Sequence, residues 1–569
     1  MRLKQFFWIA PTTVLLIVSQ TFRLNFPVPL AASPVVAQTS DARKAEADRL
    51  FQQGVQQYRN SQLQAAIKSW QQALAICREI GNRFGEATTL RNLGITYYSL
   101  KDYVKAIEYH QQSLAIAREI GDRFGEGQSL GSLGNAYDDL GDYAKATEYH
   151  QQSLAIAREI GDRAGQRAAL GNVGRAYASL GDYAKAIEYQ QQSLAIARET
   201  GDRAGEGAAL SNLGVVYFYV SDYARAIEYH HQTLAIAREI GDRQGEANAL
   251  GDLGNAYGSL GDKAQAIAYY QESLAIAKAI GDRFGEGKSL GNLGNTYGSL
   301  GNYAQAIEYQ QQSLAVARDI GDRFGEGAAL GDLGTAYYLL GDYTKAIEYL
   351  QQSLAIYRNI GYRFGEGTAL GNLGNVYDSL GSYAQAIEYQ QQSLVIRREI
   401  GDLTGEGKSL NNLGFALFNS GNFSEAERIL SVGVAKWEEI RDKLGKNDAW
   451  KVSIFEEQAI TYLLLQQVLI AQNKTDAALK ISERGRARAF VELLARGSSP
   501  QSEALAPIKY PSFKDIKKTA QQQNATIVEY SIVNFKKIEK SRLFIWVISP
   551  NGKVMFRGVD IPLLSLSEN

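Results

Sequence analysis

Asparagine and basic residues recur at fixed places along the chain, and their chemistry is that of peptide binding. An asparagine amide carries both a hydrogen-bond donor and an acceptor, so it can bond a peptide amide without reading the peptide's sequence. Lysine and arginine offer sites for acidic groups. The residues that we predict to bind a ligand are Arg91, Asn135, Asn172, Arg175, Asn212, Asn255, Lys288, Asn292, Asn295, Asn372, Asn375, Lys408 and Asn412.

These asparagines have an alternative role, as a ladder that bonds only neighbouring helices or water. Aromatic and apolar residues interrupt the pattern and predict apolar anchors on the same face. They are Tyr98, Val215, Phe218, Tyr219, Tyr338, Leu339, Phe415 and Phe418. For Phe415 and Phe418, covering the end of a repeat array is an equally good explanation.

The sequence GEGKS, at 285–289 and again at 405–409, invites a phosphate-loop interpretation. Five residues separate Gly281 from Gly287, whereas the phosphate loop needs four between its glycines. The preceding residues do not read as a strand. We therefore predict no nucleotide binding.

Three histidines, His110, His150 and His230, occupy the same slot of different copies of a repeat. His231 is adjacent to the third, and neighbouring residues do not share a helix face. We predict packed helix residues rather than a metal site, and we predict no cofactor.

Composition excludes several other classes of protein. The net charge of the 569 residues is −1, so no chain-wide field would attract nucleic acid or an anionic membrane. Cys77 is the only cysteine, which excludes an intrachain disulfide and a multi-cysteine metal site. No proline lies between Val35 and Ser499, as a long helical region requires.

The first residues have the pattern of an export signal. Arg2 and Lys4 precede an apolar run, and small residues lead to Ala37. This predicts a signal peptide of residues 1–37 and a periplasmic or extracellular mature chain without a stable membrane span. The alternative is an uncleaved N-terminal membrane anchor.

One glycine recurs every 40 residues, and this period determines the predicted fold. The ten positions are Gly54, Gly94, Gly134, Gly174, Gly214, Gly254, Gly294, Gly334, Gly374 and Gly414. In each copy two apolar stripes at helical spacing are separated by a glycine and a capping residue, as at Gly301 and Asn302. One helix pair cannot bury both stripes, but a stack can. We predict an all-α solenoid of ten helix-turn-helix repeats over 41–430.

The stretch NLGNTYGSLGNYAQAIEY, residues 292–309, resembles the tetratricopeptide repeat (TPR). The resemblance implies a right-handed superhelix whose concave groove binds protein or peptide segments. The period is longer than the family's 34 residues, and Arg318 stands near the place of the family's proline. The long repeats are most similar to those of Pins-type G-protein-signalling modulators.

The repeat pattern stops after Leu430. Residues 431–497 predict a helical extension, and 510–569 the start of an incomplete α/β domain with a helix at 512–523 and three short strands. Pro550, Asn551 and Gly552 predict a hairpin between the last two strands. The apolar run Leu543–Ile548 predicts a strand that is covered on both faces.

The stretch SERGRARAFVELLA, with the strands that follow it, resembles the opening of CHAT domains, which are caspase-like modules found after TPR arrays. In that family a histidine and a cysteine form the catalytic pair further downstream. No histidine follows His231 and no cysteine follows Cys77, so this chain does not carry that pair. The resemblance implies a truncated CHAT protein rather than an enzyme.

Three functions follow from these patterns. The first is a non-enzymatic scaffold that binds extended peptides. The second is the regulatory half of a CHAT protease whose catalytic part is elsewhere, and the third is a purely structural solenoid. Near-identical repeats also predict a tendency to self-associate.

Overall fold

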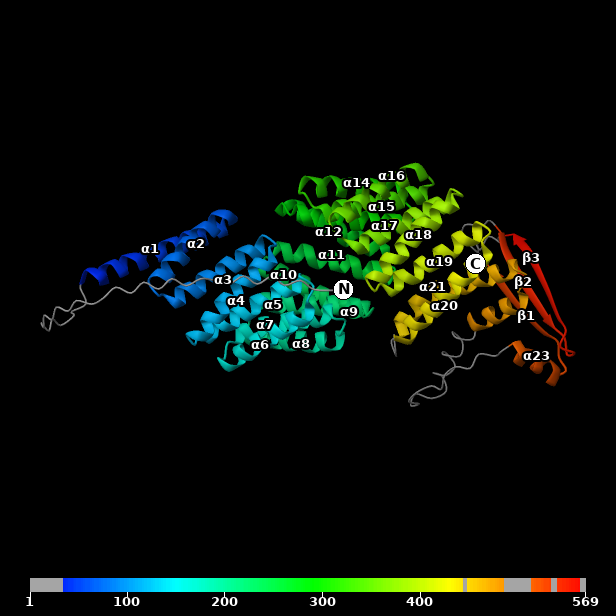
Figure 1. Cartoon of the computed structure of the whole chain (residues 1–569), viewed down its shortest axis with the longest axis horizontal. Helices are drawn as coiled ribbons and strands as arrows, with labels where there is room; N and C mark the ends of the chain where they lie inside the picture. The colour runs from blue at the N-terminus through cyan, green and yellow to red at the C-terminus, as the bar shows by residue number, and fades with distance from the viewer. Residues whose placement is uncertain (1–33, 444–447, 486–512, 534–539, 563–569) are drawn as a thin grey trace, which may run out of the picture. The chain divides into compact units, whose positions relative to one another are not determined.

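The computed structural model describes residues 34–443, 448–485, 513–533 and 540–562 (Figure 1). It divides into two compact units, Met1–Asn172 and Val173–Asn569. The predicted signal peptide lies outside the described residues except for its last four, which open the first helix. Among the described residues, no helix combines the length and the apolar character that crossing a bilayer requires.

The predicted all-α solenoid is confirmed: from α2 to α19 every helix has 17 or 18 residues and is joined to the next by a short turn. The first unit holds α1 (Pro34–Arg59), α2 (Leu63–Glu79), α3 (Arg83–Ser99), α4 (Tyr103–Glu119), α5 (Arg123–Asp139), α6 (Tyr143–Glu159) and the first part of α7 (Arg163–Ser179).

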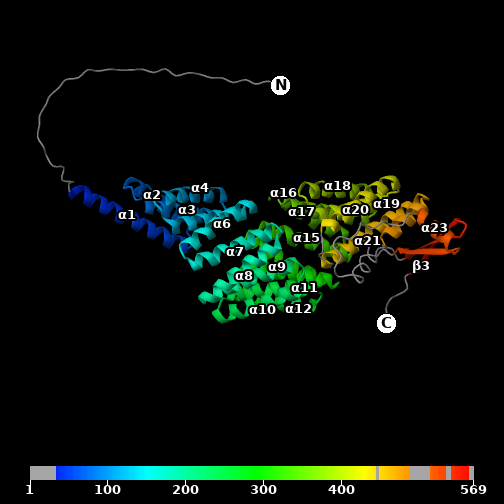
Figure 2. The same ribbon diagram turned by 90° about the horizontal axis from the view of Figure 1, so that it is seen from below.

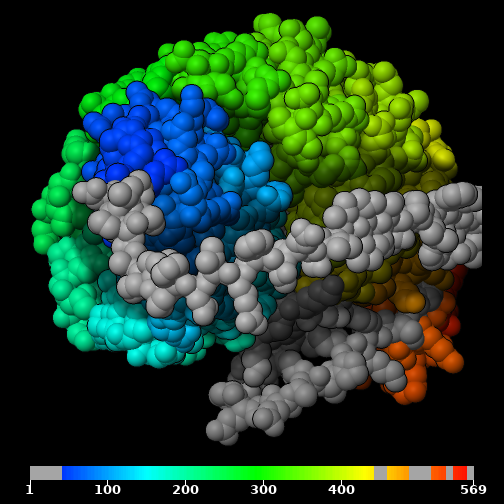
Figure 3. Space-filling view, turned by 60° about the vertical axis from the view of Figure 1, so that its left-hand side comes forward, coloured from blue at the N-terminus to red at the C-terminus, as the bar shows by residue number. Residues whose placement is uncertain are grey.

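The second unit continues the pattern, and Figure 2 shows its helices α9 to α12 side by side. Its repeat helices are α8 (Tyr183–Thr200), α9 (Arg203–Tyr219), α10 (Tyr223–Ile240), α11 (Arg243–Leu260), α12 (Lys263–Ile280), α13 (Arg283–Ser299), α14 (Tyr303–Asp319), α15 (Arg323–Leu340), α16 (Tyr343–Asn359), α17 (Arg363–Ser379), α18 (Tyr383–Glu399), α19 (Leu403–Asn419) and α20 (Phe423–Lys443). In the space-filling view these green-to-yellow repeats form a continuous packed surface (Figure 3).

The turns are built as the glycines predict. Gly281 has φ of +72° and stops α12, and the Asp282 carboxylate then accepts the Gly285 N–H at 2.9 Å to cap α13. Gly301, with φ of +78°, and Asn302 do the same before α14. Left-handed backbone at these positions favours glycine, so each copy stops and restarts its helices at a fixed residue.

The glycine that marks each copy packs against a large side chain of the partner helix. A β-carbon at Gly294 would come within 2.7 Å of the Gln310 side chain, so the close approach of the two helices depends on glycine. The pairs are Gly54–Trp70, Gly94–His110, Gly134–His150, Gly174–Gln190, Gly214–His230, Gly254–Tyr270, Gly294–Gln310, Gly334–Leu350, Gly374–Gln390 and Gly414–Leu430.

A buried glutamate joins the end of one copy to the start of the next. Glu326 accepts Arg318 Nε at 2.9 Å and also pairs with Arg323 on its own helix. Because the carboxylate is buried and bonded twice, it fixes the angle between successive copies. Equivalent glutamates stand at 86, 126, 206, 246, 286, 366 and 406.

The last helices and the sheet share one core with the end of the array. The helices α21 (Asp448–Ala471), 475–485 and α23 (Phe513–Gln522) contribute apolar residues to it. The indole N–H of Trp546 donates to the Thr475 carbonyl at 3.0 Å. Phe415 and Phe418 pack partly buried against this cluster, which favours their end-covering role.

Three strands form an antiparallel sheet in the order β1 (Ile527–Val533), β2 (Lys540–Ile548), β3 (Val554–Pro562), seen at the red end of the chain in Figure 1. The predicted hairpin is confirmed, with Gly552 at φ of +78° in its turn.

The prediction that Leu543–Ile548 is covered on both faces is wrong. Phe544, Trp546 and Ile548 are buried against the helices, whereas the alternate residues between them are only partly buried. The reason is that, among the residues that the structure describes, helices pack on one face of this sheet only, so its second face is apolar and accessible. Tyr530, on that face of β1, is 60% exposed.

Candidate functional site

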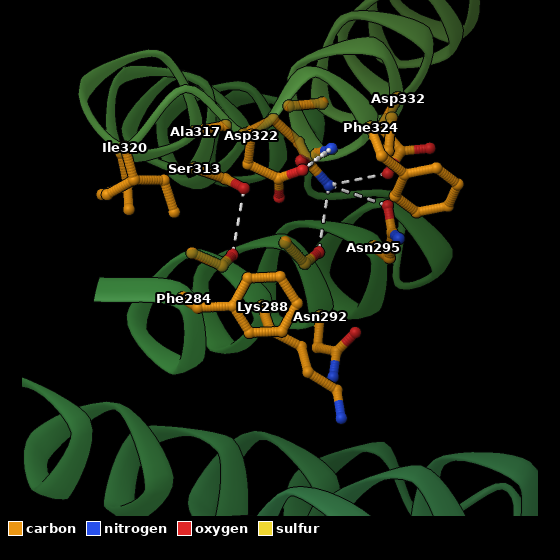
Figure 4. Close-up of a pocket in the computed structure, with 17 residues that line it drawn as sticks. Phe284, Lys288, Asn292, Asn295, Ser313, Ala317, Ile320, Asp322, Phe324 and Asp332 are labelled. Atoms are coloured by element: carbon orange, nitrogen blue, oxygen red, sulfur yellow. Dashed lines mark hydrogen bonds between the residues drawn. The ribbon is translucent and has the colours of Figure 1, made fainter. Parts of the chain in front are cut away.

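A pocket of about 410 Å³ lies among α13, α14 and α15 in the second unit (Figure 4). We call it the 284–332 pocket, after its first and last lining residues. The glycines of α13, Gly287 and Gly291, open space on the helix face because they carry no side chain. Three predicted ligand-binding residues, Lys288, Asn292 and Asn295, line this pocket.

Gln310 from α14 organises the floor of the pocket. Its amide nitrogen donates to Asn295 Oδ1 at 2.8 Å and to the Gly291 carbonyl at 3.0 Å. The same nitrogen lies 3.2 Å from Asp332 Oδ2 on α15. One side chain of α14 therefore holds groups of both α13 and α15, and the floor is preorganised.

The rim is aromatic and apolar. Phe284 at the start of α13 and Phe324 at the start of α15 are 63% and 52% exposed. Val316 and Ile320 complete the apolar wall. Exposed aromatic side chains around a polar floor are typical of sites that hold part of a ligand.

A second pocket, of about 730 Å³, occupies the corresponding place in the first unit, 160 residues earlier. We call it the 91–172 pocket. Gly127, Gly131 and Asn135 correspond to Gly287, Gly291 and Asn295, and His150 corresponds to Gln310. The repeat therefore builds the same kind of cavity twice, in each unit separately.

The 91–172 pocket is basic where the other is not. Arg91 and Arg167 line it, and position 172 is asparagine where the other pocket has Asp332. Burial lowers the pKa of Arg91, an effect that the charge of Asp122 partly opposes. Within the described part of the chain, no side chain forms a hydrogen bond or ion pair with Arg91. An anionic group of a ligand would supply that missing partner.

The remaining predicted residues have varied surroundings. Asn372 lines a smaller pocket of about 170 Å³ between α15 and α17. Arg175 and Lys408 are exposed, and Asn412 is partly buried. The structure thus brings Arg91, Asn135 and Asn172 together in one pocket, Lys288, Asn292 and Asn295 in another, and the rest in neither.

Several asparagines also serve as a ladder between helices. Asn255 Oδ1 accepts the Tyr270 hydroxyl at 2.8 Å, and Asn375 Oδ1 accepts Gln390 Nε2 at 3.0 Å. Asn212 Nδ2 donates to Gln190 Oε1 at 3.3 Å. The two roles that the sequence leaves open therefore coexist, since Asn295 is both bonded to Gln310 and part of a pocket wall.

Sequence reasoning missed the pocket-floor residues that come from the second helices and from the next copy. Gln310 and Asp332 were not among the predicted ligand-binding residues. Asp332 could have been found from the sequence because it departs from the repeat: the corresponding residue is asparagine in most other copies.

Three of the four histidines are buried among the packed helices, and His231 is exposed. His110, His150 and His230 are at most 1% exposed and lie against glycines of the partner helix. Burial lowers the pKa of His110 to about 4, with the nearby charge of Arg91 adding to the effect. Within the described ranges, no group of histidine, cysteine and acidic residues has the arrangement of a metal site.

Comparison with known proteins gives a family match over most of the repeat array. The tetratricopeptide repeat model matches residues 44–119, 125–199, 205–279, 286–359 and 365–437. Tetratricopeptide repeat protein 28 of Homo sapiens is 30% identical over 121 residues, and that of Mus musculus 29% over 123; each match covers 21% of this chain and 5% of the relative. The chain thus spans a small part of these relatives.

Among solved structures, the apo form of the quorum sensor NprR from B. thuringiensis superposes with a TM-score of 0.44 at 15% identity. That match covers 63% of this chain and 99% of the NprR chain.

Proposed function

The chain belongs to the tetratricopeptide repeat family, and from this we propose that it is a non-enzymatic scaffold that binds extended peptide segments along the face formed by the first helices of its repeats. One observation carries the proposal: the same cavity occurs in each unit at positions 160 residues apart. Both cavities are lined by helix glycines, an asparagine and polar floor residues.

This arrangement supports peptide binding for a physical reason. The stacked helices hold the polar groups in place before a ligand arrives, so little ordering of the protein opposes binding. Glycines on the first helices leave room for a ligand backbone, and asparagine amides can bond it.

Filling the cavities tests the proposal. Peptides are selected by the wild-type protein from a random library displayed on phage, and their affinities for variants are then measured by fluorescence anisotropy. Ala328→Met and Ala168→Met place side chains into the two cavities, because each alanine lines one of them. We expect affinity to fall about tenfold or more for peptides that use the filled cavity.

Matched controls come from the second helices. Ala315→Met and Ala155→Met make the same change at exposed positions that line neither cavity. These controls should bind like the wild type. If all four variants bind equally well, the proposed face is not the binding site.

A second candidate function is favoured by the C-terminal sheet. Its outer face exposes Val528, Tyr530, Ile532 and Met555, and an apolar sheet face of this kind is normally covered by another layer. Together with the CHAT-like sequence, this supports a regulatory half of a caspase-like protease. Sequencing the coding DNA past the codon for Asn569 and through the neighbouring genes tests it: a frame that encodes the rest of the domain with histidine and cysteine supports this candidate, and the absence of such a frame contradicts it.

We also propose that the chain is exported. The predicted cleavage after Ala37 gives a mature chain that starts at Gln38. N-terminal sequencing of the protein from the periplasmic or extracellular fraction should read Gln38 as the first residue. A chain that begins at Met1 would contradict cleavage.

A further inference from the structure

Asp332 departs from the asparagine ladder of the first helices. The corresponding residue is asparagine at 92, 172, 212, 292, 372 and 412. Asparagine has nearly the same shape as aspartate, and in this slot Asn212 Nδ2 donates to Gln190 Oε1 on the second helix of the preceding copy at 3.3 Å. The repeat therefore folds with a neutral amide here, and Asp332 replaces that amide by a charged group that only accepts hydrogen bonds.

No cation of the described residues pairs with this carboxylate. Its hydrogen bonds come from neutral amides, those of Gln310 at 3.2 Å and of Asn295. Lys288 lines the same pocket, but Figure 4 shows its side chain directed away from Asp332. Burial raises the pKa of Asp332 to about 6, against the lowering effect of those two hydrogen bonds.

The other acidic residue of the ladder, Asp252, has a different environment. Burial raises the pKa of Asp252, and the nearby His230 and Lys288 oppose that effect. The charge of Lys288 therefore acts on Asp252, whereas no cation of the described residues acts on Asp332.

The walls around Asp332 suit a cation on an apolar stem. The Phe324 ring lies beside Asp332, and Phe284 lies across the pocket from it (Figure 4). Both rings are more than half exposed, so they are free to contact a ligand. Aromatic faces attract ammonium and guanidinium groups and also bury methylene chains. Asp322 also lines the pocket, but its carboxylate accepts the Gly325 N–H at 3.0 Å and so caps α15.

We propose that the 284–332 pocket receives the cationic end of an arginine or lysine side chain from a bound peptide, with Asp332 as its counter-charge and Phe284 and Phe324 against its stem. This inference rests on the proposed peptide-binding function and adds the class of residue that the second unit selects. The 91–172 pocket, with its basic residues, would then select a different class of side chain.

The experiment compares two pools of short fluorescein-labelled peptides. Each peptide has one arginine among random glycine, alanine, serine and leucine residues, and in the second pool citrulline replaces the arginine. Citrulline has the shape of arginine without its charge. We expect the wild-type protein to bind the arginine pool about tenfold more tightly, as one charge-assisted hydrogen-bonded pair provides.

Two variants assign the preference to a residue. Asp332→Asn should remove the preference for arginine, while Asp252→Asn, a matched change in the same ladder, should keep it. A preference that survives Asp332→Asn overturns the inference. Thermal unfolding of each variant shows that it is folded before binding is measured.

Further outcomes separate the inference from the function on which it rests. If the wild type binds the two pools equally well, the pocket does not select a basic side chain, but the proposed peptide binding still stands. Binding of neither pool counts against both. Agmatine tests whether a small free cation is enough. If it competes as well as an arginine peptide, the pocket binds a small cation rather than the side chain of a peptide.

Discussion

The 91–172 and 284–332 pockets have the same framework and opposite charge. Both are opened by helix glycines and closed below by a side chain of the second helix, His150 in one and Gln310 in the other. One is lined by Arg91 and Arg167 and the other by Asp332. The comparison teaches that the repeat separates two tasks: apolar and glycine positions hold the helices together, while a few polar positions on the open face set the charge of each pocket.

The largest expected effect concerns pH and the first unit. The pKa of His110 is about 4 in the folded chain, well below that of a free histidine, because burial disfavours its charged form. As the pH falls from about 6.5 to about 4, the unfolded chain binds a proton that the folded chain refuses, so stability decreases by about 3 kcal/mol. His110→Gln should remove this decrease, since glutamine fills the same slot at Gln190, Gln310 and Gln390.

Hydrogen exchange of α3 and α4, measured by mass spectrometry at pH 5 and 7 and corrected for intrinsic rates, checks this prediction. The wild type should lose protection at pH 5 and the variant should not. Equal losses in both proteins would mean that His110 is not the titrating group. The helices α18 and α19, which contain neither a histidine nor Asp332, are measured in the same spectra as the internal reference.

Asp332 should give the second unit the opposite response. Its folded pKa, raised to about 6 by burial, means that its contribution to stability is complete below about pH 4 and is lost as the pH rises through 6. At pH 7 the ionised carboxylate lowers stability by about 2–3 kcal/mol. Asp332→Asn should therefore increase protection of α13 and α15 at pH 7. A less stable variant would show that the charge supports the fold.

Replacing the packed glycines by alanine compares the loss of stability next to a rigid side chain, the ring of His150, with the loss next to a flexible one, Gln310. A β-carbon at Gly134 would lie 2.5 Å from the His150 ring, and at Gly294 2.7 Å from the Gln310 amide. Overpacking costs about 1–3 kcal/mol, which exceeds the gain of about 1 kcal/mol from replacing a helical glycine by alanine. Both changes to alanine should destabilise their repeats, and Gly134→Ala more, because a buried ring cannot bend away.

The control lies one turn further along α13. A β-carbon at Gly298 would meet its nearest neighbour, Ala306 Cβ, at 3.7 Å, which is ordinary contact. Gly298→Ala should therefore stabilise by up to about 1 kcal/mol. From the highest thermal midpoint to the lowest, the expected order is Gly298→Ala, wild type, Gly294→Ala and Gly134→Ala. A midpoint of Gly298→Ala below that of the wild type would refute the packing explanation.

The fold could be predicted from the sequence because its determinants are local and repeated. Gly281 and Asp282 stop one helix and start the next within two residues, and the leucine stripe returns in every copy. The pockets could be predicted only in part. Asn292 and Asn295 share a helix face, which periodicity shows. Gln310 and Asp332 reach the same cavity from other helices, and that meeting depends on the angle between copies, which the period alone does not give.

The coverage of the C-terminal sheet shows the same limit. An apolar run such as Leu543–Ile548 indicates a strand with two apolar faces, but the run itself does not say how many layers pack on it. Only the packing of α21 and α23 on the face of Trp546 decides which side is covered.

The smallest expected effect concerns the ion pairs that connect successive copies of the repeat next to the two pockets. In the first unit Arg118 Nε lies 2.8 Å from buried Glu126, whereas the corresponding Lys278 Nζ in the second unit lies 3.9 Å from Glu286. A guanidinium reaches the carboxylate with fixed geometry, and an ammonium does not. Lys278→Arg should close this distance and add about 0.5 kcal/mol, a modest value because the lysine side chain is half exposed. Arg118→Lys should lower the stability of the first unit by a similar amount. Differential scanning calorimetry at low and high salt checks both changes, and since a gain from a partly exposed ion pair is weakened by screening, an increase that persists unchanged in high salt would have to come from packing of the longer side chain instead.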